Sequence, residues 1–146
     1  MYEGEDCYLK LIDDIIKTCS LKKDEILYIG ADDRKSSKKV IEAEKKIYAI
    51  GIPSRNLVST NNNYILGYLK NYRQISPNYF MSNNVVVIYG TKIAFPSVIN
   101  DKGVSTKTII INEPGIANQL KVYFNNLWNI ASTIDKSSAK QVFKTE

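Results

Sequence analysis

Four polar residues, Ser82, Asn84, Tyr89 and Ser97, lie in the stretch from residue 82 to residue 97, which is otherwise rich in apolar side chains. Their hydroxyl and amide groups donate and accept hydrogen bonds. Groups of this kind hold a small polar ligand, whereas bond cleavage requires an activated nucleophile or an acid–base pair. These four residues are therefore of a type suited to binding, and we assign no catalytic residue.

The sequence contains no histidine. This absence excludes a histidine nucleophile, Ser–His and Cys–His catalytic pairs, and the usual zinc sites. A mechanism based on lysine, on carboxylates or on metal-bound carboxylates stays open, with Lys92 and Asp101 as the residues to remove in a test for it. We predict that the chain is not an enzyme and that it holds no metal ion and no cofactor.

Length and composition predict one soluble domain. A chain of 146 residues buries about 68–70% of its unfolded surface without disulfides or metal ions. Hydrophobic residues make up 44% and charged residues 24% of the sequence, as in ordinary soluble proteins. No apolar run approaches the ~18 residues of a membrane span, and the first residues are acidic and periodic, unlike a signal peptide. We expect a cytoplasmic protein without a membrane partner.

The two cysteines and the basic run have simple structural explanations. Cys7 and Cys19 lie on one predicted helix, about 18 Å apart, too far for a disulfide, which needs α-carbons within about 7 Å. The net charge is +5, and its densest run, 34–46, falls on a predicted helix that also carries Glu42 and Glu44. This pattern predicts a solvated helix face rather than a nucleic-acid surface.

Hydrophobic periodicity and turn residues predict four helices and five strands. The helices are expected at 5–20, from an Asp32 or Asp33 cap to about Ile50, at 64–71, and from an Asn112 cap through Pro114 to 131. The strands are expected at 26–30, 55–59, 83–88, 92–95 and 108–112, with an extended segment at 72–76 and a hairpin turn at Tyr89-Gly90-Thr91. Early alternation of helices and strands favours βαβ units with right-handed crossovers. We predict an α/β fold with a mixed, mostly parallel sheet and helices on both faces, over residues 1–133, followed by a polar tail at 134–146.

Two sets of motifs resemble known families. Residues 82–97, SNNVVVIYGTKIAFPS, have the spacing of the phospholipase D signature H-x-K-x4-D-x6-G-S, with Ser82 at the His, Asn84 at the Lys, Tyr89 at the Asp and Pro96-Ser97 at the Gly-Ser. Tyr2-Glu3-Gly4, with the helix and ILYIGA that follow, resembles the entry to the effector domain of TrmB-type transcriptional regulators. VVVIYGTKIAFPS and KTIIINEPGIANQLKVYFNNLWNIA resemble its end.

The resemblance implies a phospholipase D-like fold whose catalytic motif has degenerated. It implies an effector-sensing and dimerisation domain of a transcriptional regulator, active as a homodimer, with Ser82, Asn84, Tyr89 and Ser97 around the candidate cleft. The effector is expected to be small and polar, such as a sugar. DNA contact is expected only through a winged-helix domain that this chain lacks. The alternative is a stand-alone protein-interaction module on the same scaffold, with exposed tyrosines as its binding surface.

Overall fold

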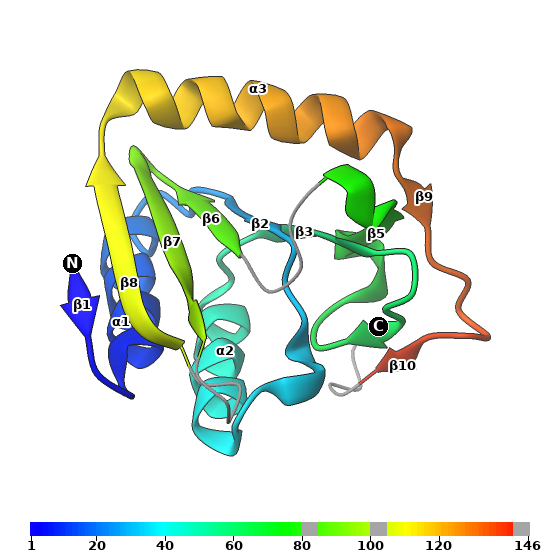
Figure 1. The fold of residues 1–146 in the computed structure, drawn as a ribbon, viewed down its shortest axis with the longest axis horizontal. Helices are drawn as coiled ribbons and strands as arrows, with labels where there is room; N and C mark the ends of the chain where they lie inside the picture. Colours follow the sequence, from blue (N-terminus) through cyan, green and yellow to red (C-terminus); the bar gives the residue numbers. More distant parts are fainter. Residues whose placement is uncertain (80–84, 100–104, 142–146) are drawn as a thin grey trace.

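The computed structural model describes residues 1–79, 85–99 and 105–141. The helices are α1 (Cys7–Cys19), α2 (Lys38–Ile50) and α3 (Pro114–Ile130), with short 3-10 turns η1 (Asp33–Lys35), η2 (Leu69–Asn71) and η3 (Pro77–Tyr79). The strands are β1 (Tyr2–Glu3), β2 (Ile26–Ile29), β3 (Ser54–Ser59), β4 (Tyr64–Ile65), β5 (Tyr72–Ile75), β6 (Val86–Tyr89), β7 (Lys92–Ile99), β8 (Ser105–Asn112), β9 (Ser132–Thr133) and β10 (Lys140–Gln141). Figure 1 shows their arrangement.

Eight strands form one mixed sheet in the order β1-β8-β7-β6-β2-β3-β5-β9. The predicted α/β class is confirmed, but the expectation that the sheet would be mostly parallel is wrong. Among the described residues of this eight-stranded sheet, only β2 with β3 and β3 with β5 pair in parallel; its other pairs are antiparallel. The βαβ crossover through α2 makes β2 and β3 parallel, and the segment through β4 and η2 brings the chain back so that β5 is parallel to β3. From β6 the chain continues through β7 and β8, which are successive antiparallel neighbours.

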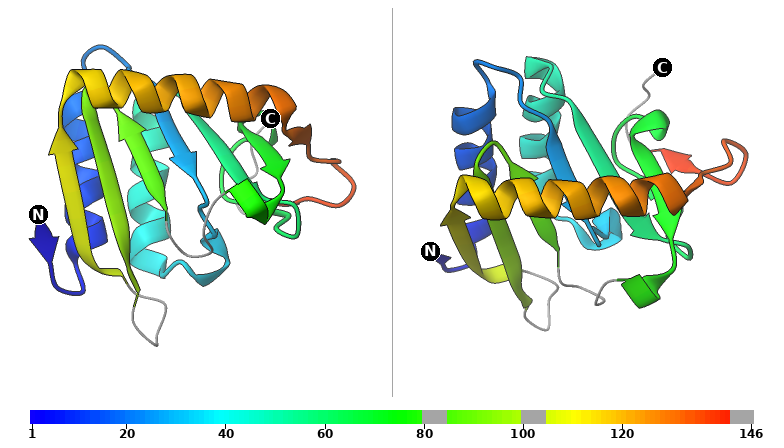
Figure 2. Two further views of the ribbon diagram at one scale, coloured as in Figure 1. Left: turned by 45° about the horizontal axis from the view of Figure 1, so that its top comes forward. Right: turned by 90° about the horizontal axis from the view of Figure 1, so that it is seen from above.

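Helices cover both faces of the sheet, as predicted. Helices α1 and α2 lie on one face, and α3 crosses the other (Figures 1 and 2). The periodic apolar residues Leu11, Ile12 and Ile15 of α1 are buried in the core between α1, α2 and the sheet, as expected for an amphipathic helix. Phe124 and Ala117 of α3 are buried in the second core on the opposite face.

The helix ends differ slightly from the predicted ones. Helix α2 begins after Ser37, whose Oγ accepts a hydrogen bond from the Val40 N–H, while Asp32 caps the separate turn η1. Helix α3 is capped by Glu113 instead of Asn112, with Pro114 in its first turn. Serine and aspartate are equally good caps, so the start of α2 could not be chosen from residue type. The Glu113 cap of α3 departs from the usual preference for Asn, Asp and Ser.

The helix predicted over 64–71 is not formed. Tyr64–Ile65 is strand β4, and Leu69–Asn71 is the turn η2. Between them, Gly67 lies so close to the Tyr48 ring that a β-carbon on Gly67 would collide with it. Packing against Tyr48 therefore overrides the local helical pattern.

The segment after α3 returns to the body of the domain. Ile134 is only 7% exposed and packs with Val58, Ile65 and Tyr72. Strand β10 pairs in parallel with β4. The domain boundary at residue 133 and the polar tail over 134–146 stay predictions, since residues 142–146 are outside the described part of the chain.

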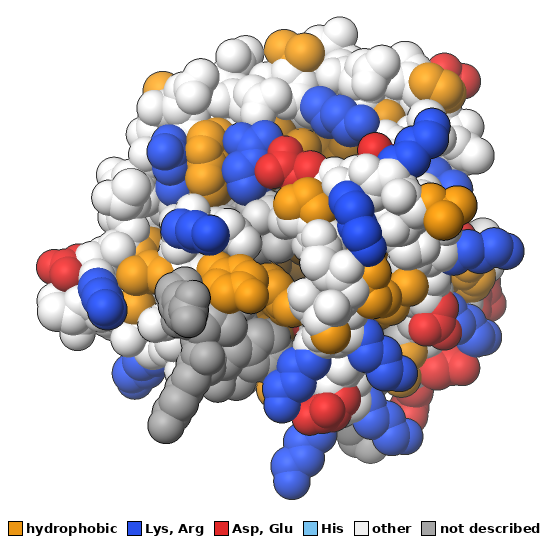
Figure 3. All heavy atoms as spheres, turned by 180° about the vertical axis from the view of Figure 1, so that it is seen from behind, with side chains coloured by type: hydrophobic (Ala, Val, Ile, Leu, Met, Phe, Trp, Pro, Cys, Tyr) orange, Lys and Arg blue, Asp and Glu red, His pale blue; other side chains and the backbone are white. Residues whose placement is uncertain are grey.

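The face formed by α1 and α2 carries many lysines with acidic side chains between them (Figure 3). The α2 residues Lys38, Lys39, Lys45 and Lys46 are exposed, and Lys45 pairs with Glu42 at 3.2 Å. The solvated basic face is confirmed. Cys7 and Cys19 are buried and form no disulfide, which confirms that they do not pair with each other. Among the helices of the described residues, none is long and apolar enough to cross a bilayer.

Candidate functional site

Four tyrosines and two carboxyl groups gather between α2 and the parallel part of the sheet. We call this group the tyrosine–carboxyl cluster; its members are Tyr8, Tyr28, Tyr48, Tyr72, Asp33 and Glu44. It lies at the side of the sheet where β2 ends and the chain turns through Gly30, which has a φ of 78°. In open α/β sheets, ligands bind outside the carboxyl ends of parallel strands. The cluster is therefore the candidate site that the fold itself indicates.

Strand register builds the floor of this cluster. Tyr28 of β2 pairs with Asn56 of β3, and Asn56 pairs with Tyr72 of β5. The three polar side chains therefore form a row across adjacent strands, on the face that α2 covers. Glu44 and Tyr48 lie four residues apart on α2, so that both point at this row. Helix α1 adds Tyr8, and the turn after β2 adds Asp33.

Glu44 is the most unusual member, since it is a carboxyl group only 7% exposed. The Tyr28 hydroxyl donates to its Oε2 across 3.4 Å. Burial, followed by the charge of nearby Asp33, raises the pKa of Glu44 to about 8, and hydrogen bonds with Tyr28 and Tyr8 offset part of the rise. Because burial disfavours the charged form, the carboxyl of Glu44 is mostly protonated at neutral pH.

The other members have pKa values displaced in the same direction. Burial raises the pKa of Asp33 to about 6, against a hydrogen bond with Ser36 that lowers it. Burial also raises the pKa of Tyr48 to about 12 and those of the other three tyrosines well above 10. The phenols therefore stay neutral and serve as hydrogen-bond donors and acceptors, and the two carboxyls change charge on either side of neutral pH.

The space inside the cluster is small. Its cavity volume is about 10 Å³, roughly the room that one water molecule needs. A bound group of this size is a water or a single hydroxyl inserted from outside. Among the described residues, no group of three or more His, Cys, Asp or Glu is placed to hold a metal ion. The arrangement is suited to hydrogen bonding and to taking up or releasing a proton.

The structure places Tyr89 away from this cluster. Tyr89 is the last residue of β6, is fully buried, and donates through its hydroxyl to Asp14 Oδ2 at 2.8 Å. Lys92 donates to both oxygens of Asp14, at 3.0 and 3.2 Å, and to Thr18. Burial, followed by the hydrogen bond with Asp14, raises the pKa of Tyr89 well above its ordinary value. Tyr89 therefore joins β6 to α1 in the native fold.

The other predicted cleft residues are placed only in part. Ser82 and Asn84 lie outside the described residues. The strand that follows them starts at Val86, which pairs with Ile29 at the carboxyl end of β2. Ser97 belongs to β7, where the pairing with β8 is irregular between Phe95 and Val98. The described structure therefore does not bring the four residues together, and their shared cleft stays a prediction.

Sequence reasoning missed the cluster and assigned Glu44 to the solvated face of its helix. That assignment is wrong, because Glu44 is buried whereas Glu42 is exposed. One signal was present: Glu44 lies four residues after Val40 and three before Ile47, both on the apolar side of α2. A carboxyl at such a position faces the core.

The fold is similar to two solved structures. One is Nuc from Salmonella typhimurium, a phospholipase D family member, with a TM-score of 0.59 and 12% identity over 92% of this chain and 97% of Nuc. The other is TrmBL2, an archaeal chromatin protein with a novel mode of DNA binding, with a TM-score of 0.57 and 16% identity over 91% of this chain and 53% of TrmBL2. This chain thus spans about half the length of TrmBL2.

Identities this low show the fold alone. The chain has a phospholipase D-like fold, which confirms the fold predicted from its resemblance to phospholipase D and to TrmB-type effector domains. No family model matches the sequence, and no curated protein matches it.

Proposed function

We propose that this chain is a non-catalytic effector-sensing and dimerisation domain of a TrmB-like transcriptional regulator, acting in the cytoplasm. The observation that carries the proposal is a phospholipase D-like fold in a chain without a single histidine. The reaction that this fold supports in phospholipase D uses a histidine nucleophile. A scaffold that lacks it is suited to binding rather than to hydrolysis.

The effector is a small polar molecule, such as a sugar, bound at the carboxyl end of β2. Two features support this location: Asp33 follows β2 there, and the chain enters β6 there directly after Ser82 and Asn84. In a homodimer, the effector would change the relative pose of the two subunits and of the winged-helix domains attached to them. Such a switch requires that the effector bind the two poses with different affinities.

Native mass spectrometry of the purified chain tests this proposal. We expect a dimer that retains a small polar molecule, and we expect Ser82→Ala and Asn84→Ala to lose the added mass while the dimer persists. Asn83→Ala is the control, since the phospholipase D-like spacing assigns no cleft residue to position 83. A dimer without an added small molecule contradicts the effector-sensing role and supports only the dimerisation role. Unchanged ligand binding in Ser82→Ala and Asn84→Ala rules out the cleft.

The alternative is a stand-alone protein-interaction module. The observation in its favour is that Tyr79 and Tyr123 are more than half exposed, at 54% and 53%, and tyrosines are enriched in protein interfaces. A monomer without a bound molecule supports this alternative. An in-frame winged-helix coding sequence upstream of Met1 supports the regulator.

The proposal that the chain is not an enzyme is tested separately. We expect no phosphodiesterase activity above background. Activity that Lys92→Ala and Asp101→Ala both abolish would contradict the proposal, because it would identify a lysine- or carboxylate-based mechanism.

A further inference from the structure

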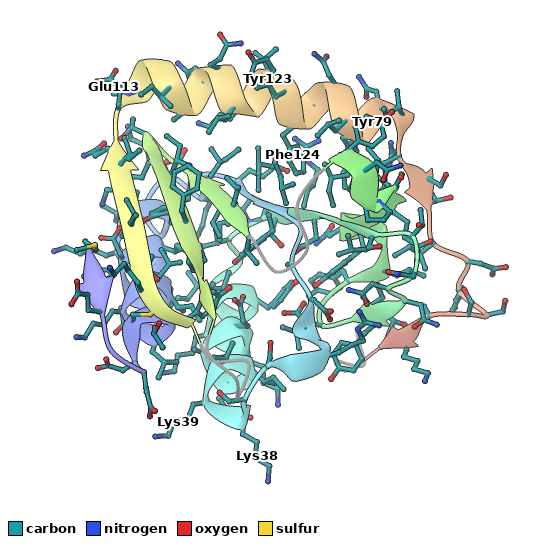
Figure 4. The ribbon with its side chains drawn as sticks, viewed as in Figure 1. Lys38, Lys39, Tyr79, Glu113, Tyr123 and Phe124 are labelled. Carbon is teal, nitrogen blue, oxygen red and sulfur yellow. The ribbon has the colours of Figure 1, made fainter. Side chains whose placement is uncertain are left out.

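The outer side of α3 presents apolar residues to solvent. Ile116, Tyr123 and Ile130 are 47%, 53% and 61% exposed. They are spaced by seven residues, or close to two helical turns, and so lie along one side of the helix. Figure 4 shows that Tyr123 points away from the sheet whereas its neighbour Phe124 points toward it. An apolar row of this kind has no partner within the described part of the chain.

Strand β8 extends this row onto the sheet. Ile109 and Ile111 are 44% and 38% exposed. They pair with Phe95 and Ile93, which belong to the core under α3, whereas Ile110 between them packs toward α1. Ile109 and Ile111 therefore face the side of the sheet on which α3 lies. Because β8 leads directly into α3, both isoleucines lie near the amino-terminal end of that helix. We call Ile109, Ile111, Ile116, Tyr123 and Ile130 the apolar surface.

Charge is almost absent from this helix. Between Pro114 and Ile130 the one charged residue is Lys121, although 24% of the whole sequence is charged. The Lys121 ammonium donates to the Gly90 carbonyl at 2.7 Å, so it is directed toward the β6–β7 turn. Depletion of charge around exposed aromatic and aliphatic residues is typical of the centre of protein interfaces.

We infer that the apolar surface binds a second copy of this chain, with the two α3 helices antiparallel about a two-fold axis near Tyr123. The spacing favours a symmetric partner. Ile116 and Ile130 lie seven residues on either side of Tyr123, about 10 Å each way along the helix. The two-fold axis therefore places Tyr123 against Tyr123 and Ile116 against Ile130 of the second copy, as an isologous interface requires. Ile109 and Ile111 then lie beneath the carboxyl-terminal end of the second copy's α3.

The five side chains supply part of the area that such a dimer needs. They are 38–61% exposed; if each loses about 50–100 Å² on association, at most half of what a large buried side chain covers, two copies bury on the order of 500–1,000 Å². Specific interfaces bury about 1,200–2,000 Å² in total. The neighbouring amide side chains of α3, Gln119 and Asn126, are exposed and supply the remainder.

This inference rests on the proposed dimerisation role and names its surface. The test is sedimentation equilibrium of the wild type, Tyr123→Glu and Val122→Glu. Val122 has the same exposure as Tyr123, 53%, but lies about 100° around the helix. We expect a wild-type dimer, a dissociation constant raised at least about 10-fold by Tyr123→Glu, as for a central interface residue, and no change in Val122→Glu.

Each result has a defined meaning. A wild-type dimer that Tyr123→Glu leaves intact, or that Val122→Glu weakens equally, overturns the inferred surface and leaves the dimerisation role standing. A wild-type monomer overturns both. Disulfide cross-linking gives a second test that does not place a charge in the interface. Tyr123→Cys should form a disulfide-linked dimer on mild oxidation, and Val122→Cys should not. The native Cys7 and Cys19 are fully buried, so background cross-linking is low. Failure of Tyr123→Cys to cross-link overturns the inferred two-fold axis.

Discussion

Tyr28 and Glu44 face each other between β2 and α2, with the phenol oxygen 3.4 Å from the carboxyl Oε2. A donor at this distance gives the buried carboxyl only a weak hydrogen bond, so its charged form is poorly compensated. The domain therefore contains a group whose protonation is coupled to folding, and this coupling gives the first prediction.

Stability should fall as pH rises because of Glu44. Its pKa is about 8 in the folded chain and 4.5 ordinarily, so between these values the folded state holds a proton that the unfolded state has lost. Stability contributed by the protonated carboxyl is present below pH 4.5 and is lost as pH rises through about 8. Asp33 acts in the same direction between pH 3.8 and about 6.

Glu44→Gln should remove most of this pH dependence. Each pKa unit corresponds to about 1.4 kcal/mol, so the variant should exceed the wild type by about 2–4 kcal/mol at alkaline pH, and the two should be similar in mild acid. Urea unfolding across pH gives the measurement. Glu42→Gln on the exposed side of α2 is the control, with a change below about 0.5 kcal/mol. Parallel pH profiles of wild type and Glu44→Gln would contradict the prediction.

Tyr89→Phe should destabilise the fold. It removes the hydrogen bond to Asp14, and hydrogen bonds to charged groups contribute about 1.5–3 kcal/mol. The Lys92 ammonium still pairs with the Asp14 carboxylate in this variant. We therefore expect the free energy of unfolding to fall by about 1–2 kcal/mol, near the lower end of the range for such hydrogen bonds. Chemical denaturation measures it. Tyr123→Phe removes an exposed hydroxyl and should change little; an equal loss in both variants would show that Tyr89 has no special role.

Gly67→Ala and Gly115→Ala should have opposite effects. A β-carbon on Gly67 collides with the Tyr48 ring, whereas one on Gly115, in the first turn of α3, only touches the Glu113 carboxylate at 3.4 Å. We expect a loss of about 1–3 kcal/mol from overpacking at Gly67 and a gain of about 0.5–1 kcal/mol from the better helix former at Gly115. Thermal unfolding compares them. A stable Gly67→Ala would mean that Tyr48 moves freely.

Arg55→Lys should loosen the attachment of α3. The Arg55 guanidinium binds both carboxylate oxygens of Glu25 at 2.8 Å and lies 5.0 Å from the Phe124 ring centroid and 5.2 Å from that of Trp128. Lysine keeps the charge but has no planar guanidinium group that could bind the Glu25 carboxylate and stack on the aromatic rings at the same time. We expect a loss of about 1 kcal/mol in denaturant unfolding. Lys45→Arg, which changes an exposed ion pair, is the control and should leave the free energy of unfolding unchanged. If Arg55→Lys also leaves it unchanged, a positive charge at position 55 is enough to hold α3 in place.

The sequence predicted the elements whose own periodicity determines them. The row Ile12, Ile15 and Cys19 predicts α1 and its buried side, and Gly90, with a φ of 58°, marks the hairpin turn between β6 and β7. These features depend on neighbours in the chain, so local pattern is enough to find them.

The features that were missed depend on distant contacts. Residues 64–71 have a helical pattern, but Tyr48 from α2 occupies the space beside Gly67 and β10 pairs with β4. The tyrosine–carboxyl cluster draws on α1, α2, two strands and a turn, so no single window of sequence contains it. The direction of strand pairing likewise depends on which strands become neighbours.

The pairing of β1 with β8 has a consequence for synthesis. Tyr2 and Glu3 pair with Thr108 and Lys107, and the Thr108 hydroxyl reaches the Cys7 sulfur at 3.6 Å. Within this domain, the strand that is synthesised first therefore has no pairing partner until β8 is available. Long-range contacts of this kind slow folding, and an unpaired strand edge exposed in the meantime favours aggregation. Closure of this edge of the sheet is thus a late step in the folding of the domain, governed by the arrival of β8.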